Sequence, residues 1–126
     1  MNQLALLHFS PAPKVSYRQH LNYSARISDL EYSFEAFKEE LKFNDQVVVD
    51  FYFSRLDEAE QFRLSRKLIE YFLEVNVNSK LIIVSPIFSV SERIHRIQSL
   101  DDFICCNYSA AIEEILFNIK AIKKAS

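Results

Sequence analysis

The sequence holds few side chains that could take part in chemistry, and the most unusual of them is Asp50. This carboxylate interrupts the run Val-Val-Val-Asp-Phe-Tyr-Phe at residues 47–53, which is otherwise apolar or aromatic. Burying an anion costs free energy unless the anion is paired or hydrogen-bonded. Asp50 is therefore either a structural carboxylate that caps nearby N–H groups at the end of a strand or a functional one whose charge state matters.

Three further groups with chemical potential, His8, Ser85 and Cys106, each follow or end a short apolar run. His8 could be a base or a metal ligand, but no second ligand stands at metal-binding spacing. We therefore favour a structural histidine with its hydrogen bonds satisfied. Ser85 precedes a proline, which is typical of a turn. Cys106 could be a redox sensor, but no cation adjoins it in the sequence, so packing is favoured.

Composition and charge limit the classes of protein to which this chain can belong. The chain has 126 residues, of which 49% are hydrophobic and 25% charged, which indicates one soluble domain over residues 1–126. The formal net charge of −2 is too small to attract phosphate backbones or anionic lipid, so we expect no direct nucleic-acid or membrane partner. No apolar run approaches the ~18 residues of a membrane span. Residues 1–3 also lack the positive charge of a secretory signal, so we predict a cytoplasmic protein.

The cysteine and glycine counts exclude further classes. Cys105 and Cys106 are adjacent, and neighbours on a strand point to opposite faces, so we expect two reduced thiols. The chain has no glycine at all. A phosphate-binding P-loop and a dinucleotide fingerprint both need glycines for close approach of the backbone to a phosphate. The nucleophile elbow of hydrolases is excluded in the same way.

Segments typical of strands and helices alternate along the chain. Apolar or β-branched runs predict strands at residues 4–7, 24–28, 47–52, 81–84 and 102–106. A short helix is expected over residues 14–21, and helical stripes run through residues 34–41, 64–75, 90–97 and 112–122. Capping-box patterns begin at Asp57 and Ser89, and Ser109 can cap the last helix.

This alternation predicts an α/β fold with a doubly wound, five-stranded parallel sheet covered by helices on both faces. The runs at 47–52 and 81–84 show no alternation that would leave one face polar and exposed to water. We therefore expect them to be central strands of the sheet. Ligands of such sheets collect at the carboxyl ends of the strands, which is where Asp50, His8, Ser85 and Cys106 fall.

The layout resembles the receiver (CheY-like) domain of bacterial response regulators, which has a flavodoxin-like topology, from residue 4 to about residue 122. The resemblance implies that Asp50 stands where receivers carry the phosphoryl-accepting aspartate. It places Ser85 at the switch hydroxyl and Phe103 at the switch aromatic. Asp57 matches a recurrent acidic position in the loop beyond Asp50.

The chain departs from the family pattern where the chemistry would be. Active receivers hold a divalent metal with an acidic pair after the first strand, and here that place is taken by His8 and Phe9. Neither offers a hard oxygen ligand for Mg²⁺. The lysine that pairs with the phosphoryl group would fall at Cys106, which supplies no cation. The resemblance therefore implies a degenerate receiver, or pseudo-receiver, with no catalytic residue, metal or cofactor.

We expect such a domain to act in bacterial signal transduction through a protein partner or an attached output domain, to which residues 119–126 could lead. One alternative is a receiver that is still phosphorylated on Asp50, with Asp57 rebuilding a metal site. Another is a domain like the anti-sigma-factor antagonists (STAS), whose fold needs an early β-hairpin.

Phe117 is the candidate interface residue. It lies off the apolar stripe of the last helix, beside Glu113 and Glu114, where a large aromatic is exposed unless something covers it. The same helix carries Lys120, so two copies related by a twofold axis could oppose unlike charges. Together with the family resemblance, this predicts a homodimer through the fourth helix, fifth strand and fifth helix.

Overall fold

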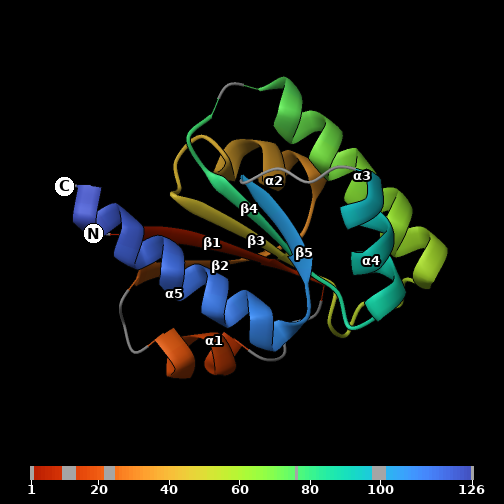
Figure 1. Cartoon of the computed structure of the whole chain (residues 1–126), viewed down its shortest axis with the longest axis horizontal. Coiled ribbons are helices and arrows are strands. Elements are labelled where there is room, and N and C mark those ends of the chain that lie inside the picture. The colour runs from red at the N-terminus through yellow and green to blue at the C-terminus, as the bar shows by residue number, and fades with distance from the viewer. Residues whose placement is uncertain (1, 10–13, 22–24, 76, 98–101, 126) are drawn as a thin grey trace.

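The computed structural model describes residues 2–9, 14–21, 25–75, 77–97 and 102–125, and Figure 1 shows a sheet between two layers of helices. The strands are β1 (Asn2–His8), β2 (Ala25–Glu31), β3 (Gln46–Asp50), β4 (Lys80–Val84) and β5 (Phe103–Cys106). The helices are α1 (Lys14–Leu21), α2 (Phe34–Glu40), α3 (Glu58–Glu74), α4 (Phe88–Ile97) and α5 (Tyr108–Ala125). All strand pairs are parallel and the order is β2-β1-β3-β4-β5, which confirms the predicted fold class.

Successive side chains along each strand point to opposite faces of the sheet and pack in two separate hydrophobic cores. On β3, Val47 and Val49 pack in the cluster beneath α2, α3 and α4, whereas Val48 packs in the cluster beneath α1 and α5. Every residue of β3 is buried, as expected for a central strand of a parallel sheet. The predicted central position of β3 and β4 is confirmed.

Strand ends differ from the predicted ones by a few residues. β2 continues to Glu31 because it pairs in register with β1 as far as the pair His8 and Glu31. β3 ends at Asp50, two residues before the expected end. Because β1 and β2 are parallel and α1 lies between them in the chain, the early β-hairpin is absent and the STAS-like alternative is wrong.

Helix starts were predicted correctly only in part. Asp57 caps α3 as expected, because its carboxylate accepts a 2.9 Å hydrogen bond from the backbone N–H of Glu60. Ser89 does not cap α4, which begins one residue earlier, and its hydroxyl instead donates to Glu58 at 2.7 Å. Ser109 lies inside α5, where the Asn107 side chain takes the capping role by accepting from the N–H of Ala110 at 2.9 Å.

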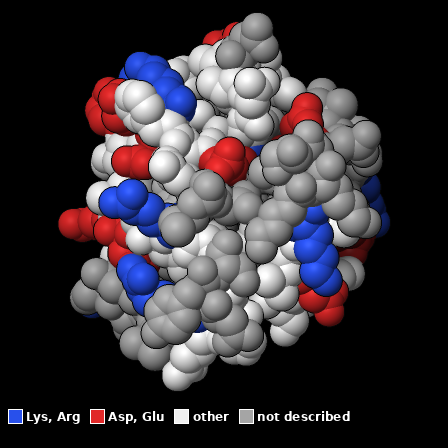
Figure 2. Space-filling view, turned by 90° about the vertical axis from the view of Figure 1, so that its left-hand side faces the viewer, with Lys and Arg blue, Asp and Glu red and all other residues white. Residues whose placement is uncertain are grey.

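Two surface properties agree with the composition. On the face in Figure 2, Lys and Arg side chains are interspersed with Asp and Glu. Of the helices that the structure describes, none has the length and apolar character needed to cross a membrane.

Candidate functional site

The candidate site lies at the carboxyl edge of the sheet, where the strand register brings the predicted residues into one row. His8 is level with Asp50, Asp50 with Val84, and Val84 with Cys106. His8 and Asp50 follow the same alternation as Leu6 and Val48, so both face the layer of α1 and α5. Asp50 is 4% exposed.

Both carboxylate oxygens of Asp50 are hydrogen-bonded within the chain. Oδ2 accepts a 2.6 Å bond from the hydroxyl of Tyr17 on α1, and Oδ1 accepts a 2.7 Å bond from the backbone N–H of Tyr52. Tyr17 is fully buried, and its ring packs edge-on against Tyr108 with centroids 5.0 Å apart. Asp50 therefore caps an N–H group, as one interpretation of the sequence held, and is also covered by a tyrosine.

Burial sets the protonation chemistry of this pair. Burial raises the pKa of Asp50, although the bonds from Tyr17 and Tyr52 and the nearby His8 act to lower it. Burial, followed by the charge of Asp50, also raises the pKa of Tyr17 above its ordinary value. Tyr17 thus stays a hydroxyl donor throughout the physiological pH range.

His8 ends β1 beside Asp50. It is buried, but neither ring nitrogen has a hydrogen-bond partner among the residues that the structure describes. That His8 is a structural histidine stays a prediction. Its register neighbour on β3 is Asp50, and both oxygens of that carboxylate hold donors from Tyr17 and Tyr52.

Phe9 and Ser85 belong to the opposite face of the sheet. Phe9 stacks on Tyr32 with centroids 4.7 Å apart and packs on the core beneath α2, α3 and α4. The buried hydroxyl of Ser85 donates to Oε1 of Gln61 on α3 at 2.7 Å, and Gln61 in turn donates to the carbonyl of Leu56 at 3.0 Å. Ser85 is thereby held toward α3 and away from Asp50.

The remaining positions of the receiver pattern are also buried. Phe103 lies in the core beneath α2, α3 and α4. Cys105 and Cys106 are free thiols that point to opposite cores, as predicted. Burial raises the pKa of Cys105 to about 11 and, with the neighbouring Cys105, that of Cys106 to about 12. Both therefore stay protonated at neutral pH and are poor nucleophiles.

Among the described residues, no group of three or more His, Cys, Asp or Glu side chains could hold a metal ion. Asp57 lies seven residues beyond Asp50 in the sequence, and its carboxylate caps α3.

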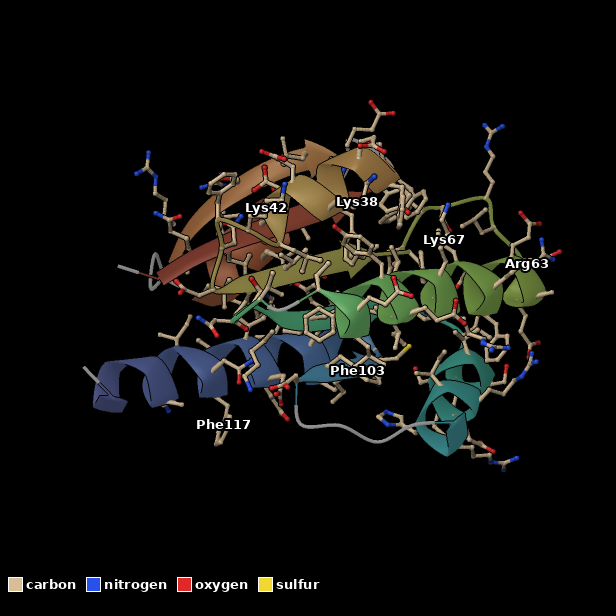
Figure 3. All side chains as sticks on the ribbon, turned by 90° about the horizontal axis from the view of Figure 1, so that it is seen from above. Lys38, Lys42, Arg63, Lys67, Phe103 and Phe117 are labelled. Carbon is tan, nitrogen blue, oxygen red and sulfur yellow. The ribbon has the colours of Figure 1, made fainter. Side chains whose placement is uncertain are left out.

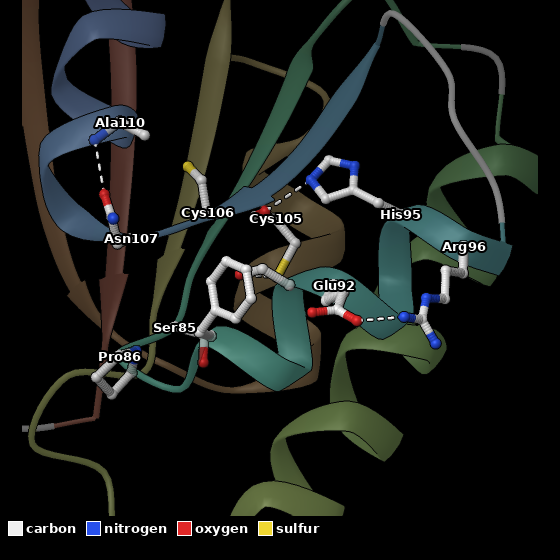
Figure 4. A pocket seen from close by; sticks show the side chains of 11 residues that line it. Ser85, Pro86, Glu92, His95, Arg96, Cys105, Cys106, Asn107 and Ala110 are labelled. Carbon is white, nitrogen blue, oxygen red and sulfur yellow. Dashed lines mark hydrogen bonds and ion pairs between the residues drawn. The ribbon is translucent and has the colours of Figure 1, made fainter.

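The face formed by α4, β5 and α5 carries large exposed aromatics and a pocket. Phe117 is 67% exposed and Figure 3 shows it pointing outward from α5, while Phe88 at the start of α4 is 78% exposed. A pocket of about 550 Å³ lies between these helices (Figure 4). Its lining residues are Ser85, Pro86, Phe88, Ser91, Glu92, His95, Arg96, Cys105, Cys106, Asn107 and Ala110.

Two interactions order this pocket. Nε2 of His95 lies 3.0 Å from the carbonyl oxygen of Cys105, so α4 is tied to the outer edge of β5. Arg96 forms an ion pair with Glu92 along the same helix. The lining of the pocket thus includes the charged pair Glu92 and Arg96 as well as the apolar Phe88 and Ala110.

Sequence reasoning missed the two residues that hold the site residues in place. Tyr17 lies on a short helix with poor apolar spacing, and Gln61 is a buried polar residue on an otherwise ordinary amphipathic helix. Each acts on a residue far away in the chain, 33 positions for Tyr17 and 24 for Gln61, so no local pattern could reveal it.

Comparison with known proteins supports the fold. No family model and no curated protein matches the sequence. Among solved structures, the chain is similar to the signal receiver domain of a protein from Vibrio parahaemolyticus described as a LuxO repressor. The TM-score is 0.65 at 12% sequence identity, and the match covers 98% of this chain and 94% of that one. The chain thus has a receiver-like fold.

Proposed function

We propose that this chain is a degenerate receiver domain that works in signal transduction through protein–protein contacts, without metal-dependent phosphorylation. The observation that carries the proposal is the state of Asp50. Each of its oxygens already accepts a hydrogen bond from the chain, and the buried Tyr17 covers it. A phosphoryl donor would have to displace Tyr17 before it could reach the carboxylate.

The groups that would stabilise a transferring phosphoryl group also differ. Phosphoryl transfer depends on a metal ion and cationic side chains that spread the developing charge. At the corresponding places this chain has His8, Phe9 and the neutral thiol of Cys106. Tyr17 supplies a hydrogen-bond donor to Asp50 in place of a cation. These substitutions support a non-enzymatic role.

The alternative of a receiver still phosphorylated on Asp50 needs Asp57 as a second metal-binding carboxylate. Asp57 is occupied instead by its bond to the N–H of Glu60 at the start of α3. A phosphoryl group on Asp50 would also have to act on the two switch positions. Ser85 is hydrogen-bonded to Gln61 and Phe103 is packed in the core, so neither side chain is free to respond. The degenerate receiver accounts for these contacts without rearrangement.

Beryllofluoride, which stands in for a phosphoryl group on a receiver aspartate in the presence of Mg²⁺, tests this proposal. We expect the amide signal of Tyr52, which is bonded to Asp50, to stay unchanged when both are added at millimolar concentration. The same experiment on Tyr17→Phe, which lacks the hydrogen bond to Asp50, tests whether Tyr17 by itself keeps beryllofluoride from Asp50. A saturable shift of the Tyr52 signal in the wild type, absent in Asp50→Asn, would overturn the proposal.

The contact surface that we propose is the α4, β5 and α5 face, with a second copy of the chain as the partner. Phe88 lines the pocket and Phe117 is exposed farther along α5, so an aromatic side chain of one copy can enter the pocket of the other. α5 carries Glu113 and Glu114 before Lys120, so a twofold axis opposes unlike charges. An attached output domain or another protein partner could use the same face.

We further propose that the protein acts in the cytoplasm as a single receiver-like domain over residues 1–126. The free thiols of Cys105 and Cys106 suit a reducing compartment.

A further inference from the structure

A row of cations crosses the outer surface of α2, α3 and α4, and the proposed function makes no use of it. This basic row consists of Lys38, Lys42, Arg63, Arg66, Lys67 and Arg93. Figure 3 shows four of its members, Lys42, Lys38, Lys67 and Arg63, in one line from the turn after α2 to α3. Lys38 is half-buried, and the other five are exposed, so the basic row is open to a partner.

The ring of Phe34 on α2 holds two of these cations from different helices. The ammonium of Lys67 on α3 lies 4.2 Å from the ring centroid, and that of Lys38 on α2 lies 5.2 Å from it. A cation over an aromatic face is attracted by the ring quadrupole, which restricts where its side chain can go. The half-buried ring therefore keeps two like charges near each other at the boundary between α2 and α3.

The ring of Phe62 on α3 does the same at the boundary with α4. The guanidinium of Arg93 on α4 lies 3.7 Å from the ring centroid, and that of Arg66 lies 6.0 Å from it. Because Arg93 packs on α3, it stands on the side of α4 that is turned away from β5. The basic row is thus separate from the pocket between α4 and α5.

Carboxylates of the chain neutralise only part of the basic row. Three cations have ion-pair partners at 2.8–3.6 Å, namely Lys38 with Glu35, Lys42 with Glu39 and Arg66 with Glu70. All three carboxylates are exposed, and exposed pairs of this kind contribute little and exchange easily. Within the part of the chain that the structure describes, Arg63, Lys67 and Arg93 have no ion pair, although Glu60 stands one turn before Arg63.

We propose that the basic row is the docking surface for an acidic segment of a partner protein, whose carboxylates pair with Arg63, Lys67 and Arg93. The charge of such a segment complements the row, and the two arginines can each accept a carboxylate in a bidentate pair. A carboxylate bound beside Phe34 or Phe62 also reduces the repulsion between the two cations at that ring. The rings hold the cations in place beforehand, which lowers the entropy lost on binding.

Nucleic acid and anionic membranes are the other anions that a basic surface can attract. Proteins that bind single-stranded nucleic acid combine cations with aromatic rings on which bases stack. Here the rings of Phe34 and Phe62 are half-buried and already hold cations. The chain as a whole has a net charge of −2, which opposes approach to a long polyanion or a charged lipid surface. A short acidic segment needs only the cations of the row, so we favour it.

Fluorescence anisotropy with a short labelled peptide in which Glu alternates with Ser tests the proposal on the full chain. We expect saturable binding at low ionic strength that weakens as salt is added, because exposed charges are screened. The same peptide with Gln in place of every Glu should not bind. In NMR spectra of the complex, the amide signals that shift should belong to α2, α3 and α4.

Paired substitutions locate the binding surface. Arg63→Gln combined with Lys67→Gln removes two unpaired cations from the row and should weaken peptide binding about tenfold. The matched control combines Arg26→Gln on β2 with Lys120→Gln on α5, which removes the same charge from other exposed positions. Its affinity should stay within about twofold of wild type, because charges outside the interface act only through the screened overall field. Neither Asp50 nor dimerisation enters this test, so the proposal fails separately from the proposed function.

Several results would overturn the proposal. They are a wild type that does not bind the Glu peptide at low salt, equal binding of the Glu and Gln peptides, and an Arg63 and Lys67 double variant that binds like wild type. A single-stranded oligonucleotide and vesicles containing anionic lipid are run in the same assay. Tighter binding of either one than of the Glu peptide would replace the acidic protein segment with that polyanion.

Discussion

Replacing Tyr17 by Phe measures how much the cover over Asp50 contributes to the fold. The substitution keeps the buried ring and its edge-on contact with Tyr108, and it removes only the hydroxyl that donates to Asp50 at 2.6 Å. Hydrogen bonds to charged groups contribute about 1.5–3 kcal/mol to stability. We therefore expect Tyr17→Phe to lower the free energy of unfolding by about 2 kcal/mol at pH 7.

The pH dependence of this loss follows from the pKa of Asp50, which burial raises above its value in the unfolded chain. A raised pKa means that the folded state binds the proton more tightly, so ionisation of Asp50 costs stability as the pH rises through the folded-state pKa. Tyr17 reduces that cost because its bond favours the carboxylate. The loss in Tyr17→Phe should consequently be largest above the pKa of Asp50 and shrink toward about 1 kcal/mol once Asp50 is protonated.

Urea denaturation followed by circular dichroism gives the free energies, with Asp50→Asn and the double variant completing a cycle. The interaction free energy between Tyr17 and Asp50 from this cycle should be nearly as large as the loss of stability in Tyr17→Phe. A loss below about 0.5 kcal/mol at pH 7, or additive effects of the two substitutions, would refute the account of Asp50 as a carboxylate held by Tyr17.

Three further substitutions test the core, a helix cap and the contact face. Val49→Asp should lower the free energy of unfolding by several kcal/mol, because Val49 is fully buried and an unpaired carboxylate there is costly; a denaturation midpoint equal to wild type would contradict this. Asn107→Ala should cost about 1 kcal/mol of stability while Ser109→Ala costs far less, since only Asn107 caps α5, and equal losses would argue against that cap. Phe117→Lys should weaken dimerisation by on the order of 1–3 kcal/mol without unfolding the monomer, measured by light scattering over a concentration series. Phe43→Lys, at an aromatic of similar exposure in the turn after α2, is its matched control, and a wild type that stays monomeric would refute the dimer.

The sheet could be predicted from the sequence because its strands are local, continuous apolar runs. The residues at 47–49 and 81–84 are buried on both faces, so their composition alone identifies them as central strands. Their ends were less certain, because the pairing of β2 with β1 extends the strand to Glu31 through residues with no apolar pattern. Cap positions failed at Ser89 and Ser109 because several residues near each start can cap a helix, and packing decides which one does.

The contacts of the site could not be predicted, because they join residues that are distant in the chain. The strand-end rule placed Asp50 and His8 at one edge, and the structure has them level with each other. It gave no information on Tyr17, which reaches Asp50 from a helix whose sequence pattern is weak. The bond from the backbone N–H of Tyr52 to Asp50 is also invisible to a local pattern, because it depends on how the chain turns after β3.

Intact-mass spectrometry after incubation with acetyl phosphate and millimolar Mg²⁺ tests most directly whether Asp50 has lost its phosphoryl-accepting role. The account predicts that the wild-type protein stays unmodified, because Tyr17 covers Asp50 and the positions of His8, Phe9 and Cys106 supply neither acids nor a lysine. Stoichiometric addition of one phosphoryl group to the wild type, absent in Asp50→Asn, would contradict it.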